Sequence, residues 1–390
     1  MRWASAISRE ADTALALDAL ASALRFELPA GPDLVLGFAT PQHSRAYTRI
    51  PRLVAERFPR AVFAGCSGQG VIGGREEIDG APALALLAAE LPGVALGAFH
   101  LRARDVPEPD DVTGWQARLG STDPRTHVLV FCDPFSCEVE PVLAGLDRAF
   151  PLGRKLGGLA SGGRLPQSNA LFAGASFQHS GLAGVTLTGA IELDCVVAQG
   201  CRTIGEPMIV TRCDDNQILE LDGRPALAVV RELYDALVAQ DRKLFERALF
   251  LGIEMRDQRA YQAGDFLLRN VLAVDRDRGS VAVAAHLERY QAVQLHLRDP
   301  AAAAADLARQ LVRYRERQPG VPAGALLFPC LSRGEAFYGR PNHDSELVRA
   351  HLGPVPLAGF FANGEVGPVG PRTFLHGQTA VLALARPPDA

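Results

Sequence analysis

Apolar and polar positions along the chain follow one order of elements more than once. A short apolar run at 33–40 predicts a strand, residues 49–58 have helical spacing, and AVFAG at 61–65 predicts a second strand that runs into a glycine-rich loop. The same order returns from His127 and again from Gly324. This recurrence indicates an internal duplication of strand–helix–strand units.

The loops that follow the second strands share a glycine spacing. In the first loop Gly65 is followed by Gly70 and Gly73, and in the third loop Gly359 is followed by Gly364 and Gly367. The second loop keeps only part of this spacing, with Gly157 and Gly162. We therefore predict an α/β (α+β) fold of two related modules in a pseudo-symmetric arrangement. Strand–helix units mixed with hairpins favour mixed sheets covered by helices over a purely parallel fold.

Between the repeats the pattern predicts further elements. Residues 175–201 alternate β-branched residues with glycine turns, as antiparallel strands do. Residues 224–249 have the pattern of a long helix, and a hairpin turn is expected at 275–279. An alanine-rich helix is expected at 299–313, with Asp299 as its N-cap before a proline.

The domain boundary is expected near Leu221–Pro225, where strands pass into the long helix. We thus expect an amphipathic N-terminal helix at 1–30, a first module at 31–223 and a second at 224–390. About 150 residues per domain also suits two or three domains in 390 residues.

Composition restricts the classes of function. A net charge of −4 is too small to attract nucleic acid or an acidic membrane to the whole surface. Acidic residues interrupt the N-terminal region where a signal peptide would need apolar ones, and no stretch resembles a membrane span. Seven cysteines without a C-x-x-C pair indicate reduced thiols. We expect a cytoplasmic protein.

The sequence motifs of common enzymes are either absent or lie in the wrong structural context. Gly68–Gly73 reads G-x-G-x-x-G, but Gly80 and Pro82 stop the helix that a dinucleotide site requires. The nucleophile elbow, the P-loop and zinc-protease motifs are absent from the sequence. We expect neither a catalytic residue nor a metal site.

The densest group of polar residues lies near the C-terminus, at the ends of predicted strands and in glycine loops. Arg333 could hold a carboxylate, and Glu365 could pair with an amine or another cation. For Asp344 we leave two interpretations open, ligand contact and capping of a helix that starts at Ser345. Together with two residues of the first glycine loop, the candidate ligand-binding residues are Ser67, Gln69, Cys330, Arg333, His343, Asp344, Asn363, Glu365 and His376.

Four stretches make the chain resemble the FIST family of bacterial sensory domains, which has N- and C-terminal modules. They are GCSGQGVIGG at 65–74, residues 199–227, HLRDPAAAAADL at 296–307, and residues 328–382 with NHDSE and VPLAGFFANGEVGPVG. The resemblance implies a non-enzymatic sensor of a small molecule such as an amino acid, with the ligand in a cleft between the modules. Signalling would then pass through a partner protein in trans, and homo-oligomer formation stays open.

Three alternatives remain at this point. Some bacterial relatives look like haem-binding nitric-oxide sensors, and an axial ligand would come from Cys330, His343 or His376. A cysteine-dependent enzyme would use Cys330 as nucleophile and His343 as base. A platform that recruits protein partners is compatible with ligand sensing. We otherwise expect no cofactor.

Overall fold

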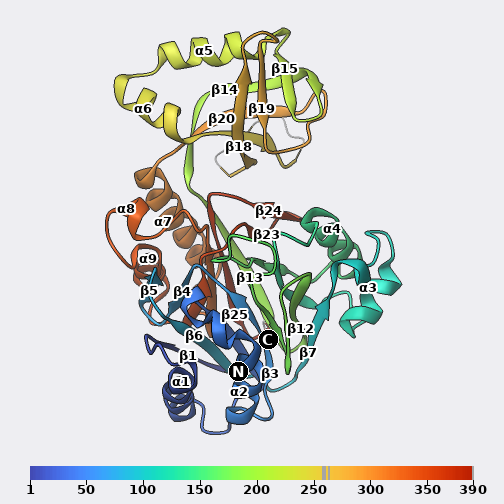
Figure 1. The fold of residues 1–390 in the computed structure, drawn as a ribbon, viewed down its shortest axis with the longest axis vertical. Helices are drawn as coiled ribbons and strands as arrows, with labels where there is room; N and C mark the ends of the chain where they lie inside the picture. Colours follow the sequence, from blue (N-terminus) through green and yellow to red (C-terminus); the bar gives the residue numbers. More distant parts are fainter. Residues whose placement is uncertain (257–260, 262–263, 389–390) are drawn as a thin grey trace. The chain divides into compact units, whose positions relative to one another are not determined.

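The structure is a computed structural model that describes residues 1–256, 261 and 264–388 (Figure 1). The chain forms two compact units. Unit 1 comprises Met1–Val197, Leu307–Leu375 and Thr379–Ala390, and unit 2 comprises Ala198–Asp306 and His376–Gln378. Each unit has a hydrophobic core of its own. The expected module 224–390 contributes to both units, and it includes 257–260, 262–263 and 389–390, which lie outside the described residues.

One succession of elements occurs three times among the described residues, and it lies in unit 1 except for 198–199, 300–306 and His376, which belong to unit 2. Copy 1 consists of β1 (Arg2–Ser8), α1 (Thr13–Glu27), β2 (Leu34–Ala39), α2 (Ile50–Arg57), β3 (Val62–Ser67), β4 (Gly70–Gly73), β5 (Glu76–Asp79) and β6 (Leu84–Glu90). Copy 2 consists of β7 (Val94–Leu101), α3 (Val112–Leu119), β8 (His127–Cys132), α4 (Val139–Ala149), β9 (Lys155–Leu159), β10 (Leu171–Ala173), β11 (Ser176–Gln178) and β12 (Leu182–Gly189). Copy 3 consists of β13 (Glu192–Gln199), α7 (Pro300–Arg317), β21 (Gly324–Pro329), α9 (His343–Leu352), β22 (Leu357–Phe360), β23 (Glu365–Val369), β24 (Arg372–His376) and β25 (Thr379–Arg386).

The three copies exchange their hairpins in a ring. In each copy the two central strands are parallel, and the last strand returns antiparallel to the first of them. The hairpin β4–β5 of copy 1 extends the sheet of copy 3, β10–β11 of copy 2 extends that of copy 1, and β23–β24 of copy 3 extends that of copy 2. Residues far apart in the sequence are thereby brought together, and the α/β class with mixed sheets is confirmed.

Equivalent residues support the threefold arrangement. A Cβ atom added to Gly65, Gly157 or Gly359 would lie 1.8, 1.9 or 1.8 Å from a carbonyl oxygen of the neighbouring parallel strand, so only glycine fits at these points. On those neighbouring strands, Phe38, Phe131 and Phe328 pack edge to face with ring centroids 5.7–6.4 Å apart. These rings lie in the core that the three sheets share.

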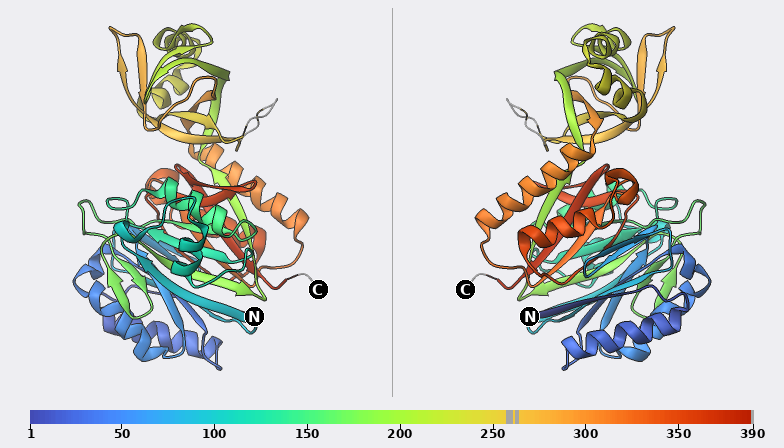
Figure 2. Two further views of the ribbon diagram at one scale, coloured as in Figure 1. Left: turned by 90° about the vertical axis from the view of Figure 1, so that its right-hand side faces the viewer. Right: turned by 90° about the vertical axis from the view of Figure 1, so that its left-hand side faces the viewer.

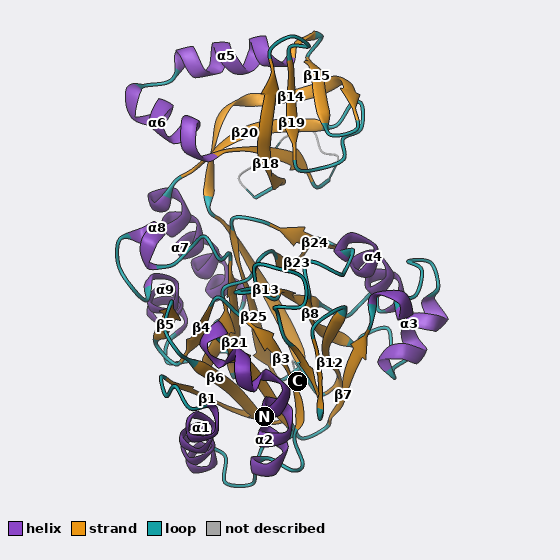
Figure 3. Cartoon of the chain, viewed as in Figure 1, coloured by secondary structure: helices purple, strands orange, loops and turns teal. Residues whose placement is uncertain are grey.

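Helices cover the outer faces of the sheets of unit 1 (Figures 2 and 3). Leu17 and Leu20 of α1 and Val54 of α2 are buried in one cluster with residues of β2 and β3. The helices α3 and α4 bury Trp115 and Leu146 against the sheet of copy 2. Two short 3-10 helices, η1 (Pro41–Arg49) and η2 (Ala103–Asp105), and helix α8 (Glu335–Tyr338) lie in the connections.

The expected N-terminal helix is shorter than its pattern suggested. It begins at Thr13, because the side chain of Asp12 accepts hydrogen bonds from the N–H groups of Ala14 and Leu15. Residues Arg2–Ser8 form β1 instead, which pairs antiparallel with β6. The extension of the helix toward the chain start was therefore wrong, since pairing with a strand distant in sequence decides the conformation there.

Unit 2 is a small closed β structure inserted between β13 and α7 of copy 3. Its elements are β14 (Cys201–Asp214), β15 (Gln217–Leu221), β16 (Arg224–Pro225), α5 (Ala226–Ala236), α6 (Ala239–Ala248), β17 (Leu249–Glu254), β18 (Phe266–Asp275), β19 (Ser280–Val283) and β20 (Ala292–Arg298). The strand order is β14-β20-β17-β18-β19-β15, and an additional pairing of β14 with β15 closes the sheet.

Several local predictions can be compared with this structure. The long helix expected at 224–249 is two helices, because Leu237 and Val238 have extended backbones. The hairpin turn at 275–279 and the N-cap Asp299 are confirmed. The glycine motif at 68–73 opens into the hairpin β4–β5 and not into a helix, as expected. Among the described helices, none is both long and apolar enough to cross a bilayer.

Candidate functional site

The turn after β21 positions Arg333. Its N–H donates to the carbonyl of Cys330 at 2.8 Å. Copies 1 and 2 close the same turn after their first central strand, with the N–H groups of His43 and Ser136 donating to the carbonyl three residues earlier at 3.0 and 3.3 Å. Arg333 therefore occupies the position that a histidine and a serine hold in the other two copies, and an arginine is not needed to form the turn.

Arg333 and Asp344 form a buried ion pair in unit 1. The Arg333 Nε donates to Asp344 Oδ2 at 2.8 Å and Nη2 to Oδ1 at 3.1 Å, and both side chains are only 1% exposed. His343 Nδ1 lies 2.9 Å from the same Oδ1. Burial opposes ionisation of Asp344, but the Arg333 charge and the hydrogen bonds with His343 and Arg333 together outweigh burial and lower the pKa of this carboxyl. Two arms of the guanidinium thus bind a carboxylate of the protein itself.

The start of α9 tests one of the two interpretations of Asp344, the capping of the helix. The helix begins at His343 with Asn342 as the N-cap residue, so Asp344 is the second helical residue. Its carboxylate binds the side chains of Arg333 and His343 and not the backbone N–H groups at the described start of the helix. The capping interpretation was wrong, because the helix starts two residues earlier than we expected.

Helix α8 holds Tyr338 over this pair. The Tyr338 ring stacks on His343 with centroids 3.5 Å apart, and the Arg333 guanidinium carbon lies 5.5 Å from the Tyr338 ring centre. Gly334 and Gly339 flank the helix with φ of +92° and +71°, a region that favours glycine. The Arg333 Nη1 has no hydrogen-bond partner among the described residues although it is buried.

Glu365 is the second buried acid of the group. Its Oε2 accepts hydrogen bonds from the backbone N–H of Thr379 at 3.1 Å and from the Thr379 hydroxyl at 2.6 Å. Its Oε1 is buried and has no hydrogen-bond partner among the described residues. Burial raises the pKa of Glu365 to about 8, against the smaller opposing effects of Thr379, Cys330 and Arg333. The site therefore contains a carboxyl group that can be neutral near pH 7.

The pseudo-symmetry identifies what the other copies hold at the position of Glu365. Glu365 pairs with Gly158 of β9, Val71 pairs with Phe360 of β22, and Leu171 pairs with Cys66 of β3. These three pairs are equivalent in the ring of exchanged hairpins. Val71 and Leu171 are buried apolar residues, so the fold forms at this position without a carboxyl group.

Glu77 joins the group from copy 1, although no sequence pattern indicated this residue. Its Oε1 accepts the N–H of Ser345 at 2.6 Å, and its own N–H donates to the Asn342 side chain at 2.8 Å. Burial and the nearby Asp344 charge raise the pKa of Glu77 to about 7. The exchange of the hairpin β4–β5 into the sheet of copy 3 brings Glu77 to α9, and only the three-copy topology could have revealed this.

The three glycine loops lie side by side in unit 1. The N–H of Ser161 donates to the Ser67 carbonyl at 3.1 Å, and the N–H of Asn363 donates to the Leu159 carbonyl at 3.0 Å. The Ser161 hydroxyl accepts the Gln69 N–H at 2.8 Å and donates to the Phe361 carbonyl, which links the remaining pair of loops. Ser161 was missing from our candidate residues, since the middle loop matched the glycine pattern only in part.

The candidate residues thus fall into groups. Cys330, Arg333, His343, Asp344 and Glu365 are buried in copy 3. In the loops, Gln69 and Asn363 are exposed, while Ser67 is buried and its hydroxyl donates to the Ser161 carbonyl and accepts the Ala170 N–H. The ring of Phe361 connects the two groups, because a Cβ on Gly70 or Gly334 would lie 2.8 or 3.1 Å from it.

His376 belongs to unit 2, where it is buried, whereas the other candidates belong to unit 1. Among the described residues, no group of three His, Cys, Asp or Glu side chains is placed to hold a metal ion. His343 is stacked on Tyr338 and bonded to Asp344, and Cys330 is buried beside the Ser332 hydroxyl at 3.2 Å. These surroundings do not fit an axial haem ligand, which must face a porphyrin.

Comparison with known proteins places this chain in a family. Residues 33–224 match the FIST N domain and residues 226–368 match the FIST C domain. The chain therefore belongs to the FIST family, whose domains are recognised as small-ligand sensory domains. The residues of the buried group come from both matched segments, Glu77 from the first and Arg333, Asp344 and Glu365 from the second.

The chain is also similar along its whole length to mycobacterial proteins. An uncharacterized protein of Mycobacterium tuberculosis is 36% identical over 386 residues, which cover 98% of this chain and 99% of that protein. An uncharacterized protein of Mycobacterium bovis is 34% identical over 354 residues, which cover 90% of each chain. A crystal structure of cyanuric acid hydrolase from A. caulinodans covers 100% of both chains at 12% identity, but its TM-score of 0.32 is too low to carry an argument.

Proposed function

We propose that this protein is a non-enzymatic sensor that binds a small, amino-acid-like molecule at the buried group of copy 3. The observation that carries the proposal is Glu365, a fully buried carboxyl with one oxygen left without a hydrogen bond. Leaving a buried polar atom unpaired costs about 1–3 kcal/mol. A ligand that supplies the missing partner would recover this cost on binding.

The equivalent positions in copies 1 and 2 argue against a structural role for the carboxyl. Val71 and Leu171 fill those positions with apolar side chains, and the same strand pairing forms around them. Similarly, the turn that carries Arg333 forms with other residues in both copies. The charged groups of copy 3 are therefore additions to the fold, which is expected of a functional site.

The unpaired atoms match the two charged ends of an amino acid. Arg333 Nη1 donates hydrogen bonds and cannot accept one, so it suits a ligand carboxylate. Glu365 Oε1 suits a ligand ammonium, because an adjacent cation would lower the raised pKa of Glu365 and convert the carboxyl to its charged form. Binding would then couple to loss of a proton from Glu365.

Entry to the buried group requires a movement, and α8 supplies a suitable element. This helix covers Arg333 and His343 through Tyr338, and it lies between two glycines with positive φ. We propose that α8 moves to admit the ligand and that its two positions are the states which a partner protein reads in trans.

The experiment is a thermal-shift screen of amino acids and related metabolites against wild type and one non-binding variant. The variant Cys330→Thr/Glu365→Val/Thr379→Ala gives copy 3 the residues of copy 1, where the Thr40 hydroxyl accepts the Ala83 N–H at 2.9 Å beside Val71. We expect at least one compound to raise the unfolding midpoint of wild type and none to raise that of the variant. Glu346→Gln, an exposed acid of α9, is the control that should respond like wild type.

A further inference from the structure

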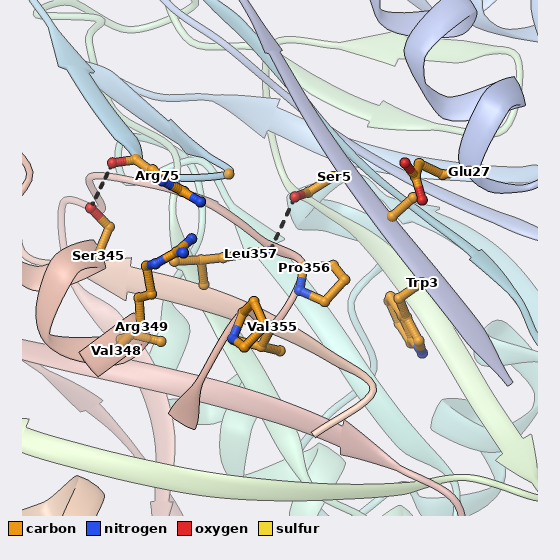
Figure 4. A pocket seen from close by; sticks show the side chains of 13 residues that line it. Trp3, Ser5, Glu27, Arg75, Ser345, Val348, Arg349, Val355, Pro356 and Leu357 are labelled. Carbon is orange, nitrogen blue, oxygen red and sulfur yellow. Dashed lines mark hydrogen bonds between the residues drawn. The ribbon is translucent and has the colours of Figure 1, made fainter. Parts of the chain in front are cut away.

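A cavity of about 440 Å³ lies in unit 1 on the side of α9 that faces the start of the chain (Figure 4). Its walls come from β1, the turn between β4 and β5, α9 and the segment that leads into β22. The volume is in the range of small-molecule sites in proteins. None of the candidate residues discussed above lines this cavity.

Two arginines give the cavity a concentration of positive charge. Arg75 and Arg349 both line it, and in Figure 4 their side chains extend toward one another. Neither has an ion pair or a side-chain hydrogen bond in the described structure. Three nearby acids are already engaged: Glu76 with Arg9, Glu77 with the Ser345 N–H, and Glu346 with Arg340.

The rest of the wall is largely apolar. Trp3, Val355, Pro356 and Leu357 line one side, and Trp3 lies away from the two arginines in the view of Figure 4. Glu27 is the acidic residue on the wall, and it lies near Trp3 in that view. Two converging guanidinium groups at one side and an apolar surface at the other define a ligand with a charged head and an apolar body.

We propose that this cavity binds a small organic molecule with a doubly charged head group, of the chemical class of an aromatic phosphate monoester. The two guanidinium groups would each donate hydrogen bonds to the head group, and the apolar body would lie against Trp3 and Val355. This site is separate from the one under Proposed function and does not depend on it. Both sites use α9, however, since Ser345 lines the cavity and its neighbour Asp344 belongs to the buried group.

The test is calorimetric titration of the whole protein with phenyl phosphate. Because a hydrogen bond to a charged group contributes about 1.5–3 kcal/mol, Arg75→Gln and Arg349→Gln should each weaken binding about tenfold or more. Arg340→Gln, an exposed arginine of the same region that pairs with Glu346, should bind as wild type does. All three positions are exposed, so these variants should keep the unfolding midpoint of wild type.

Two further titrations separate the parts of the proposal. Phenol, which lacks the charged head, should not bind, and inorganic phosphate should bind more weakly than phenyl phosphate because it cannot contact Trp3. The Glu365 triple variant should bind phenyl phosphate like wild type, which distinguishes this site from the proposed sensor site. Absence of phenyl phosphate binding, equal affinity of the arginine variants and wild type, or equal affinity for phosphate and phenyl phosphate would overturn the proposal.

Discussion

Glu365 accepts both hydrogen bonds that Thr379 offers, from its backbone N–H at 3.1 Å and its hydroxyl at 2.6 Å, through a single carboxyl oxygen. The other oxygen is left buried without a partner. In copy 1 the equivalent positions hold Val71 and Ala83, so this carboxyl–hydroxyl pair is a feature of copy 3. The pair fixes the orientation of the carboxyl.

The pH dependence of stability should reveal the buried acids. Folded Glu365 holds its proton up to about pH 8, whereas the unfolded chain releases it near 4.5. Above about pH 6.5 the buried His127 and His296, whose pKa values burial lowers to about 4, no longer contribute an opposing slope. There the folded state binds more protons through Glu365, so the free energy of unfolding should fall as pH rises toward 8. Glu77 acts in the same direction up to about pH 7. Urea denaturation of wild type at a series of pH values measures this decline.

The variant Glu365→Gln isolates one contribution. Its amide can still accept the hydrogen bonds of Thr379 but does not titrate. The decline of stability with pH should become shallower, and the part above about pH 7 should disappear, because Glu77 has then lost its proton. Glu346→Gln, which changes an exposed acid, should leave the pH profile as it is in wild type. An unaltered profile in Glu365→Gln would show that this carboxyl is ionised in the folded protein.

The ion pair between Arg333 and Asp344 should contribute far more to folding than its exposed counterpart. Removing one partner leaves an unpaired buried charge, so Asp344→Asn should lower the free energy of unfolding by about 3–5 kcal/mol. The pair of Arg340 and Glu346 is exposed on both sides, and Glu346→Gln should cost less than about 1 kcal/mol. Chemical denaturation of both variants tests the contrast, and equal losses would contradict the burial of Asp344.

The glycines at the close approach of the parallel central strands should be essential to the stability of all three copies. Gly65→Ala, Gly157→Ala and Gly359→Ala should each destabilise or prevent folding, because each added Cβ would lie within 1.9 Å of a carbonyl oxygen. Gly320, which has no atom within 4 Å of an added Cβ, provides the control. Gly320→Ala should fold with a stability close to wild type. Comparable thermal midpoints for all four variants would rule out the close strand approach in the three copies.

Local sequence patterns predicted much of the fold correctly. The apolar runs at 33–40, from His127 and from Gly324 became the first central strands of the three copies, since a buried parallel strand has a near-continuous apolar sequence. The errors lie where distant pairing decides the structure. Residues 2–8 form a strand because β6 pairs with them, and residues 224–249 break at Leu237.

The candidate site was predictable only in part. Arg333, Asp344 and Glu365 could be named because charged residues at the ends of apolar strands are conspicuous in a sequence. Their arrangement was not predictable, since Arg333 binds Asp344 directly and a ligand carboxylate could reach only its remaining nitrogen. Glu77 and Ser161 were missed because the hairpin exchange and the loop contacts join residues that are far apart in the chain.

Native mass spectrometry of the protein with a mixture of amino acids tests the proposed sensing role most directly. The account predicts that wild type retains one compound at one copy per chain, and that the triple variant with the residues of copy 1 stays folded and retains none. Equal retention by both proteins, or no bound compound on wild type, would contradict the assignment of Glu365 and Arg333 to a ligand site.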